Sequence, residues 1–246
     1  MKKCNSVAEG VAAILAVYDF VPEKTWQLLP AGDGDLTETL VLDGTAYPFY
    51  WWRADTQLVQ MAALAPGRNP CAMKLNRTGA ASFGLERLLY KELDAAEWML
   101  ASPVEKVMCM KNGKSMNVIA TMENGRVAVF ELAATLHEGT REQGRHTYWG
   151  TDGMASDLVV SQKLPAEALY LFTEDKAEPE LYNDIFIYTY GLSMSDTTRA
   201  ACIAEILMGR RDISDWREKD AHYRRVLAAV RRSEETGLCV RLEEMA

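Results

Sequence analysis

The sequence has few of the residues that build metal sites, disulfide frameworks or membrane spans. It contains three histidines, His137, His146 and His222, and no HExxH, HxH or CxxC spacing, which argues against a metal site. Its five cysteines are dispersed, at Cys4, Cys71, Cys109, Cys202 and Cys239. This pattern predicts free thiols in a reducing compartment. No apolar run reaches about 18 residues, and Glu9 interrupts the apolar start without a cleavage site following it. We therefore expect a cytoplasmic protein without a bound metal.

The chain also lacks an excess of basic residues and any nucleotide-binding motif. With 27 Lys and Arg against 35 Asp and Glu, its formal net charge is −8, which argues against nucleic acid and anionic membranes as partners. Gly32 and Gly34 form a lone GxG that leads into a strand pattern rather than a helix. There is no P-loop and no GxSxG. We therefore expect no nucleotide module and no cofactor.

Hydrophobic periodicity predicts where the helices and strands lie. Apolar residues at i, i+3 and i+4 predict helices, and β-branched runs between turn dipeptides predict antiparallel strands. The expected helices span residues 6–18, 54–64, 84–101, 196–208 and 215–235. The expected strands are a hairpin over 36–52 around Asp43-Gly44, a meander over 104–162 with turns at Asn112-Gly113 and Asn124-Gly125, and runs at 166–172, 184–192 and 238–242. Residues 65–79, "APGRNPCAMKLNRTG", are rich in turn formers and are predicted to form a loop.

This order of elements predicts the fold class. Strands that follow each other through hairpins are antiparallel. We therefore expect a single α+β domain over residues 1–246, with one large, mostly antiparallel sheet and helices packed on one face.

The helix expected at 84–101 contains two notable charged residues. A helical wheel divides it into an apolar arc (Leu85, Leu88, Leu89, Leu93, Ala95, Ala96, Met99, Leu100) and a second arc (Glu86, Arg87, Tyr90, Asp94, Glu97, Trp98). Glu92 falls within the apolar arc, where a carboxylate needs a basic partner, hydrogen bonds or a raised pKa, unless that face opens onto a solvent-filled cleft. Lys91 lies at the border, where its simplest interpretation is a snorkelling side chain paired with Asp94.

A series of motifs follows in a fixed order from residue 79. The segment "GAASFGLERLLYKELDAAEWMLASPVEKV" has a glycine-rich entry, Asp94, Trp98-Met99-Leu100 and a strand beginning at Val104. After it come an Asn-Gly hairpin, the turn "YWGTDG", and a last helix that stops at Thr236-Gly237 before a closing strand. This series resembles the C-terminal domain of the Gfo/Idh/MocA (glucose–fructose oxidoreductase / inositol dehydrogenase) family and implies its fold for residues 79–246. Residues 1–78 resemble it poorly and are expected to be a divergent helix and hairpin region.

Two departures from the family pattern decide what the resemblance implies for function. The family's N-terminal Rossmann domain, with its nicotinamide site, is not recognisable, so we expect the chain to lack it. Lys91 takes the place of the family's catalytic histidine, while Arg87 and Leu89 replace the preceding Asp and Gly; only Asp94 is kept. A general acid/base is thus replaced by a group with an unperturbed pKa of about 10.4. The resemblance therefore implies an oxidoreductase-like fold that has lost its redox chemistry.

A second candidate site is the aromatic segment "FYWWR". Adjacent aromatic residues with an arginine suit either a hydrophobic core or interface, or the stacking of a sugar. As a strand, the segment would place Trp51 and Trp52 on opposite faces. The candidate ligand-binding residues are Trp52 and Arg53 here, with Arg87 and Tyr90 of the helix. Glu131, His137 and His146 are interpreted as ordinary sheet and turn residues.

Two functions fit these features. In the first, the chain is a self-associating module that binds a small polar, sugar-like ligand or a full-length dehydrogenase of the family. A sheet face rich in apolar residues needs a cover, and a homodimer is the simplest one. In the second, it is an enzyme on a sugar or sugar acid, using Lys91 with Glu92 or Asp94 without a nucleotide, or using NAD(P) with a cofactor domain supplied in trans. A catalytic lysine would need a pKa lowered by burial to about 7–8.

Overall fold

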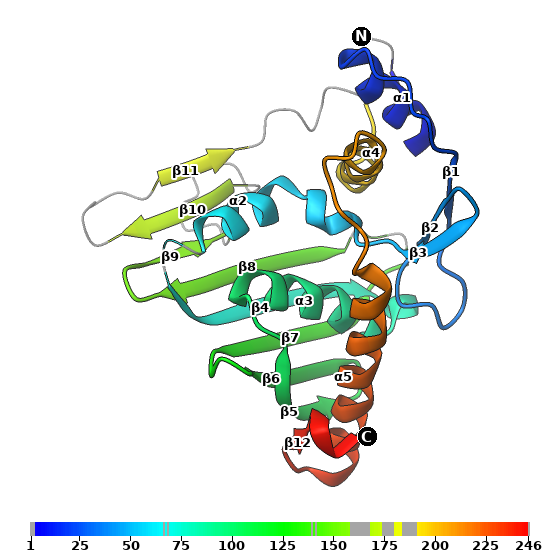
Figure 1. Cartoon of the computed structure of the whole chain (residues 1–246). Helices are drawn as coiled ribbons and strands as arrows, with labels where there is room; N and C mark the ends of the chain where they lie inside the picture. Colours follow the sequence, from blue (N-terminus) through cyan, green and yellow to red (C-terminus); the bar gives the residue numbers. More distant parts are fainter. Residues whose placement is uncertain are drawn as a thin grey trace. The chain divides into compact units, whose positions relative to one another are not determined.

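The computed structural model describes residues 3–65, 67, 69–138, 140, 142–157, 168–173, 180–183 and 191–245 (Figure 1). Its contacts divide the chain into two compact units. Unit 1 consists of Met1–Val59 and Asp184–Asp220, and unit 2 of Gln60–Asn183 and Ala221–Ala246. The boundaries fall inside two helices, α2 (Thr56–Leu64) and α5 (Trp216–Thr236). We expected one domain in which residues 1–78 form a divergent region. The boundaries between the two units do not fall at residue 78.

Unit 1 combines two helices with a small sheet. The sheet is antiparallel, in the order β1 (Trp26–Leu29), β2 (Thr39–Leu42), β3 (Thr45–Pro48). Its second hairpin turns at Asp43-Gly44, where both residues have positive φ, as predicted. The helices are α1 (Val7–Val17) and α4 (Met194–Leu207), which begin at the N-caps Ser6 and Ser193. Gly10 allows them to approach, because a Cβ there would lie 2.7 Å from the Leu192 side chain and 3.0 Å from that of Ala200.

The prediction that "FYWWR" is a strand is wrong. Strand β3 ends at Pro48, and residues Trp51–Ala54 form a 3₁₀ helix, η1. Its tight turns are closed by i→i+3 bonds, including Arg53 N–H to Tyr50 O at 3.1 Å. Trp52 packs edge-on against Tyr50 at 5.3 Å between ring centroids. The aromatic residues therefore form a cluster in the core of unit 1 instead of alternating between two faces.

Unit 2 is built on a mixed sheet of nine strands among the described residues. The order is β11-β10-β9-β8-β4-β7-β6-β5-β12, and only β4 and β7 pair in parallel in the ladders described. The strands are β4 (Pro70–Ala80), β5 (Val104–Asn112), β6 (Ser115–Met122), β7 (Val127–Leu136), β8 (Gln143–Gly150), β9 (Gly153–Ser156), β10 (Ala168–Thr173), β11 (Glu180–Asn183) and β12 (Val240–Arg241). The α+β class is therefore as predicted. The strand expected at 184–192 lies mostly outside the described residues.

Strand β4 corrects the predicted loop at 65–79. Met73, Leu75 and Arg77 point to the buried face, whereas Lys74, Asn76 and Thr78 alternate with them on the other. The strand has no hairpin to either neighbour: it pairs with β7, about 55 residues later in the chain, and with β8, about 70 residues later. Its pairing is therefore long-range, which local turn propensity cannot indicate.

Helix α3 (Leu85–Leu100) and the unit 2 part of α5 lie on the same face of this sheet (Figure 1). Gly79 of β4 lets α3 come close, since a Cβ there would lie 3.0 Å from the side chains of Leu88 and Phe83. The division of α3 into two arcs was wrong for Tyr90 and Asp94, both fully buried. Tyr223 of α5 covers them: its ring lies 5.7 Å from that of Tyr90, and its hydroxyl donates to Asp94 Oδ1 at 3.1 Å.

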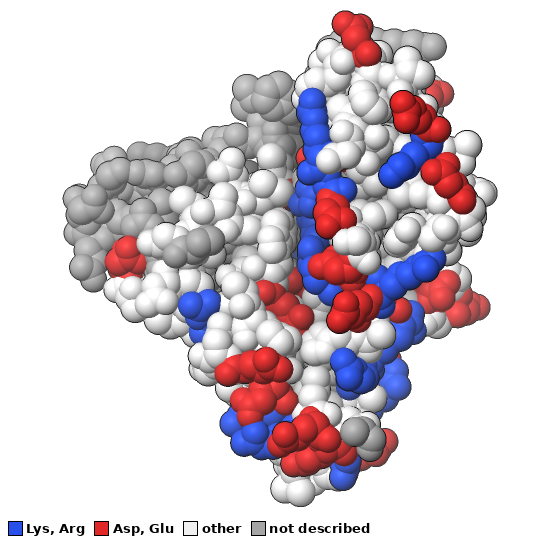
Figure 2. Space-filling model, viewed as in Figure 1, with Lys and Arg blue, Asp and Glu red and all other residues white. Residues whose placement is uncertain are grey.

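Short 3₁₀ helices complete unit 2, at Ala81–Phe83 (η3) and Leu242–Met245 (η4). No helix in the part of the chain that the structure describes is long and apolar enough to cross a membrane. The charged surface is mixed, with basic and acidic side chains interspersed on the face shown in Figure 2.

Candidate functional site

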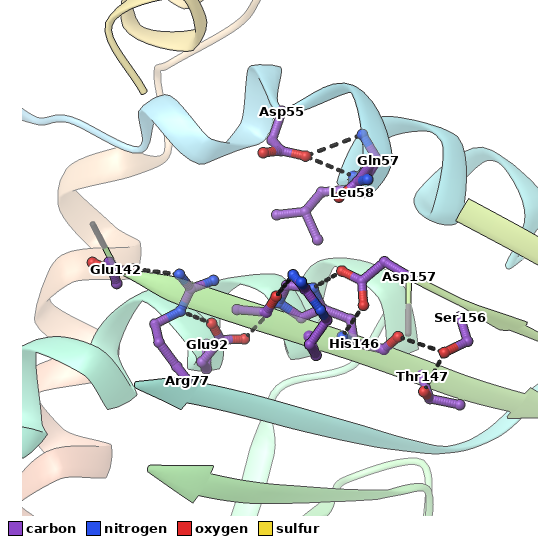
Figure 3. Close-up of polar contacts among 12 residues, drawn as sticks. Asp55, Gln57, Leu58, Arg77, Glu92, Glu142, His146, Thr147, Ser156 and Asp157 are labelled. Atoms are coloured by element: carbon purple, nitrogen blue, oxygen red, sulfur yellow. Dashed lines mark hydrogen bonds and ion pairs between the residues drawn. The ribbon is translucent and has the colours of Figure 1, made fainter. Parts of the chain in front are cut away.

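Six charged side chains of unit 2 form a chain of alternating sign, which we call the ionic ladder. All of them except Lys91 are labelled in Figure 3. From one end to the other its members are Lys91, Glu142, Arg77, Glu92, His146 and Asp157. Helix α3 contributes two of them, β4 and β8 one each, and the remaining two directly precede β8 and follow β9. With the histidine protonated, three positive groups face three negative ones. The ladder is therefore neutral as a whole.

The centre of the ladder is the ion pair between Arg77 and Glu92. The side chain of Glu92 has no exposed surface and that of Arg77 is 5% exposed. The guanidinium binds Glu92 through Nε and Glu142 through Nη1. It lies over the backbone of Gly144, its register partner on β8, where a Cβ would come within 2.6 Å of Nη2. A glycine at this position is therefore what leaves room for the arginine.

The electrostatic state of Glu92 follows from its neighbours. Burial alone would raise its pKa, but the charges of Arg77 and His146 oppose it and hold the pKa at about 2. A carboxylate in the apolar arc of α3 was expected to need a basic partner, and Glu92 has two, Arg77 and His146.

His146 is held between two carboxylates. Its Nε2 lies 3.0 Å from Glu92 Oε2 and its Nδ1 2.8 Å from Asp157 Oδ2. Ionised carboxylates can only accept hydrogen bonds, so both ring nitrogens must donate and the ring is an imidazolium. The two negative charges accordingly raise its pKa to about 9, against the effect of burial. His146 is a sheet residue, as interpreted, but its two buried carboxylate partners were not foreseen.

Lys91 and Glu142 form the outer end of the ladder. The ammonium lies 3.1 Å from Glu142 Oε1, and the two side chains are 13% and 24% exposed. Two cations, Lys91 and Arg77, hold the pKa of Glu142 at about 2. Burial and the nearby Arg77 charge lower the pKa of Lys91, and Glu142 and Glu92 oppose this effect. The net result is a lowered pKa. The ladder thus reaches solvent at Lys91 and Glu142.

The structure brings together two of the three predicted catalytic residues. Lys91 and Glu92 both belong to the ladder, joined through Glu142 and Arg77. Asp94 is fully buried and accepts a hydrogen bond from Tyr223 of α5.

The predicted ligand-binding residues do not form one cluster. Arg87 stacks on Phe83, 5.0 Å from the ring centroid, and Tyr90 is fully buried in the core. Trp52 and Arg53 belong to unit 1, where Trp52 is buried and Arg53 lies 5.7 Å from the centroid of the Tyr50 ring. Their role as ligand contacts stays a prediction.

Four ladder residues were missed by reasoning from the sequence: Arg77, Glu142, His146 and Asp157. Arg77 had a detectable signal, because it continues the alternation of Met73 and Leu75 on the buried face of a strand. The position of Glu92 required a basic partner but did not identify it. Nothing local marked Glu142 or Asp157, which lie outside regular elements.

Two further features of unit 2 bear on ligands. Among the described residues, no group of three or more His, Cys, Asp or Glu side chains could hold a metal ion. A hollow of about 250 Å³ lies between the start of α3, the β5–β6 turn and the end of α5, lined by Gly84, Lys111, Lys114, Arg231 and Glu234 among others. None of the ladder residues lines it. The hollow and the ladder are thus separate features.

Comparison with known proteins identifies the fold. No protein-family model and no curated protein matches the sequence. Among solved structures, an oxidoreductase from Agrobacterium radiobacter in complex with NAD⁺, L-tartaric acid and magnesium matches with a TM-score of 0.63 at 12% identity, over 99% of this chain and 72% of that chain. A myo-inositol dehydrogenase from Corynebacterium glutamicum matches with a TM-score of 0.57 at 18% identity, over 78% of this chain and 63% of that chain.

An apo scyllo-inositol dehydrogenase from Lactobacillus casei matches with a TM-score of 0.58 at 12% identity, over 79% of this chain and 62% of that chain. The chain thus spans less than two thirds of the length of both inositol dehydrogenases. At these identities the likeness shows that the chain has a fold seen in oxidoreductases, as the resemblance implied.

Proposed function

We propose that the chain is a homologue of the Gfo/Idh/MocA oxidoreductases that is not redox-active by itself and that acts as a self-associating module for a small polar, sugar-like ligand. One observation carries this proposal: Lys91, which the resemblance puts at the place of the family's catalytic histidine, is bound by Glu142 at the end of a buried ionic ladder. A histidine there would exchange protons near neutral pH. An ammonium paired with an ionised carboxylate instead holds a fixed charge, which suits binding.

The open face of the nine-stranded sheet supports self-association. Met108 of β5 and Ile119 of β6 are register partners on this face, opposite α3, and both are exposed. Met110 and Trp149 are exposed on the same side. A patch of this kind favours a covered state, and an isologous contact between two copies covers both patches at once.

Sedimentation velocity tests the self-association. We expect the wild-type protein to sediment as a dimer and Ile119→Lys to sediment as a monomer. Val17→Lys is the matched control, because Val17 is also exposed but lies on α1 of unit 1. A monomeric wild-type protein at tens of micromolar would contradict this part of the proposal. A complex with a full-length family dehydrogenase is the alternative, and would appear as a faster-sedimenting species when the two proteins are mixed.

Thermal shift tests the ligand and the redox part. We expect inositols, sugars or sugar acids to raise the melting temperature, and NAD⁺ and NADH to leave it unchanged. A saturable, NAD(H)-dependent stabilisation of the isolated protein would contradict the loss of redox chemistry.

The enzymatic alternative also has an observation in its favour. Burial and the Arg77 charge lower the pKa of Lys91, in the direction that a catalytic lysine requires. In this case the chain would act on a sugar or sugar acid through Lys91 and Glu92, or receive NAD(P) from a domain supplied in trans. An activity found by screening such substrates, and abolished in Lys91→Met with the fold intact, would favour this alternative.

A further inference from the structure

We propose that Arg77 and Lys91 form a binding site for the carboxylate of a small ligand, and that the side chain of Glu142 occupies this site when the ligand is absent. The inference rests on the proposed ligand-binding function and deepens it by naming the ligand class, a small monocarboxylate such as a sugar acid.

The first argument is the convergence of two cations on one oxygen. Arg77 Nη1 and Lys91 Nζ both bind Glu142 Oε1. The ammonium reaches this oxygen from helix α3 and the guanidinium from strand β4, elements that are packed against each other. The backbone positions of Lys91 and Arg77 are therefore set by the packing of α3 on β4.

The second argument is unused bonding capacity. Arg77 binds Glu92 through Nε and Glu142 through Nη1, so Glu142 meets only one edge of the guanidinium. Glu142 binds only through Oε1 in the described part of the chain. A carboxylate placed in the plane of the guanidinium would use both of its oxygens and more of the donors than Glu142 does.

The third argument is charge. Without Glu142 the ladder would hold three cations and two anions, and a buried excess positive charge is unfavourable. The site therefore needs an occupant with a single negative charge. A monocarboxylate restores the balance, whereas a doubly charged phosphate would exceed it. Glu142 also has the most exposed side chain of the six ladder residues. It is therefore the one that an incoming ligand can replace from solvent.

Isothermal titration of sodium gluconate into Glu142→Gln and wild-type protein, at matched ionic strength, tests the inference. If Glu142 occupies the site nine tenths of the time, its removal tightens gluconate binding about tenfold. The gain should disappear in Glu142→Gln combined with Lys91→Met. Glu138→Gln is the matched control: Glu138 is a nearby glutamate that accepts bonds from Ser82 and has no cation among its hydrogen-bond partners. Glu142→Asp, which keeps the charge but shortens the side chain, gives the same test if Glu142→Gln does not fold.

The outcomes separate the inference from the proposed function. Equal gluconate affinities in wild type and Glu142→Gln, or an equal gain in Glu138→Gln, would overturn the role of Glu142. Tighter binding of inorganic phosphate than of gluconate by Glu142→Gln would overturn the monocarboxylate class. Binding of neutral inositol but of no carboxylate would overturn the whole inference and leave the proposed function standing. If neither inositols nor sugar acids bind, the proposed function fails.

Discussion

Replacing Glu92 by glutamine should destabilise unit 2 more than most single substitutions. The change keeps the shape of the side chain but removes the negative charge between Arg77 and His146, two buried cations that both donate to it. The amide can accept from only one of them, because its nitrogen is itself a donor. Removing one member of a buried ion pair costs about 3–5 kcal/mol, since the partner charge stays behind unpaired.

The ionisation of Glu92 gives a second estimate of the same size. Its pKa is held at about 2, against an ordinary value of 4.5. Each pKa unit corresponds to about 1.4 kcal/mol, so the folded protein favours the ionised form by about 3 kcal/mol. Because the pKa is lowered on folding, this stabilisation is present above pH 4.5 and is lost as the pH falls from 4.5 to about 2. Glu92→Gln should therefore be less stable at pH 7 and lose less stability on acidification than the wild type.

Urea unfolding followed by far-UV circular dichroism measures this loss. We expect a decrease of about 3–5 kcal/mol at pH 7, or a melting temperature lower by about 6–20 °C for a chain of this size. Hydrogen exchange at the amides of β4 and β8 should localise the change to unit 2. Glu86→Gln is the control, because Glu86 lies on the same helix in an exposed pair with Arg231 and should lose no more than about 1 kcal/mol. Equal losses in the two variants would refute the argument that the ladder stabilises the fold.

Three other perturbations test separate contacts. The pKa of His146 is raised to about 9 from 6.5, so the stabilisation of the fold by its charge is complete below pH 6.5 and is lost as the pH rises through 9. Urea unfolding of the wild type should therefore show about 3 kcal/mol less stability at pH 10 than at pH 6. His146→Gln should show a smaller difference. Gly144→Ala places a methyl group against the Arg77 guanidinium and should cost about 1–3 kcal/mol in urea, so a wild-type midpoint would refute the packing argument. Tyr223→Phe removes the hydrogen bond to Asp94 and should lower the free energy of unfolding by about 1–3 kcal/mol; an unchanged value would mean that another group satisfies the carboxylate.

The elements that could be predicted from the sequence are those with local signals. Helix α3 was placed to within a residue or two, since its apolar period is local and Pro103 limits its end. The hairpins at Asn112-Gly113 and Asn124-Gly125 were also placed correctly, and both glycines have the positive φ that such turns require. In each of these cases the deciding interactions lie within a few residues of one another.

The errors came from contacts between distant segments. Strand β4 was taken for a loop, because its proline, glycines and asparagines favour turns while its partners lie about 55 and 70 residues later in the chain. Tyr90 and Asp94 were placed on the second arc of α3, outside the apolar one, and their burial was not foreseen because the helix that covers them, α5, begins more than 120 residues later. A wheel finds the more apolar face of a helix but cannot show that a second face is also covered.

The ladder differs along its length in how much the fold depends on it. At the inner end, Glu92, His146 and Asp157 hold charges away from water, and the loss of any one leaves a buried partner without its counter-charge. At the outer end, Lys91 and Glu142 are partly exposed, so water can screen a change there. If Glu142 moves away, Arg77 keeps Glu92 and the inner pairs stay as they are. A ligand carboxylate in its place would therefore have to compete only with Glu142, while the inner ladder continues to hold Arg77 in position for binding.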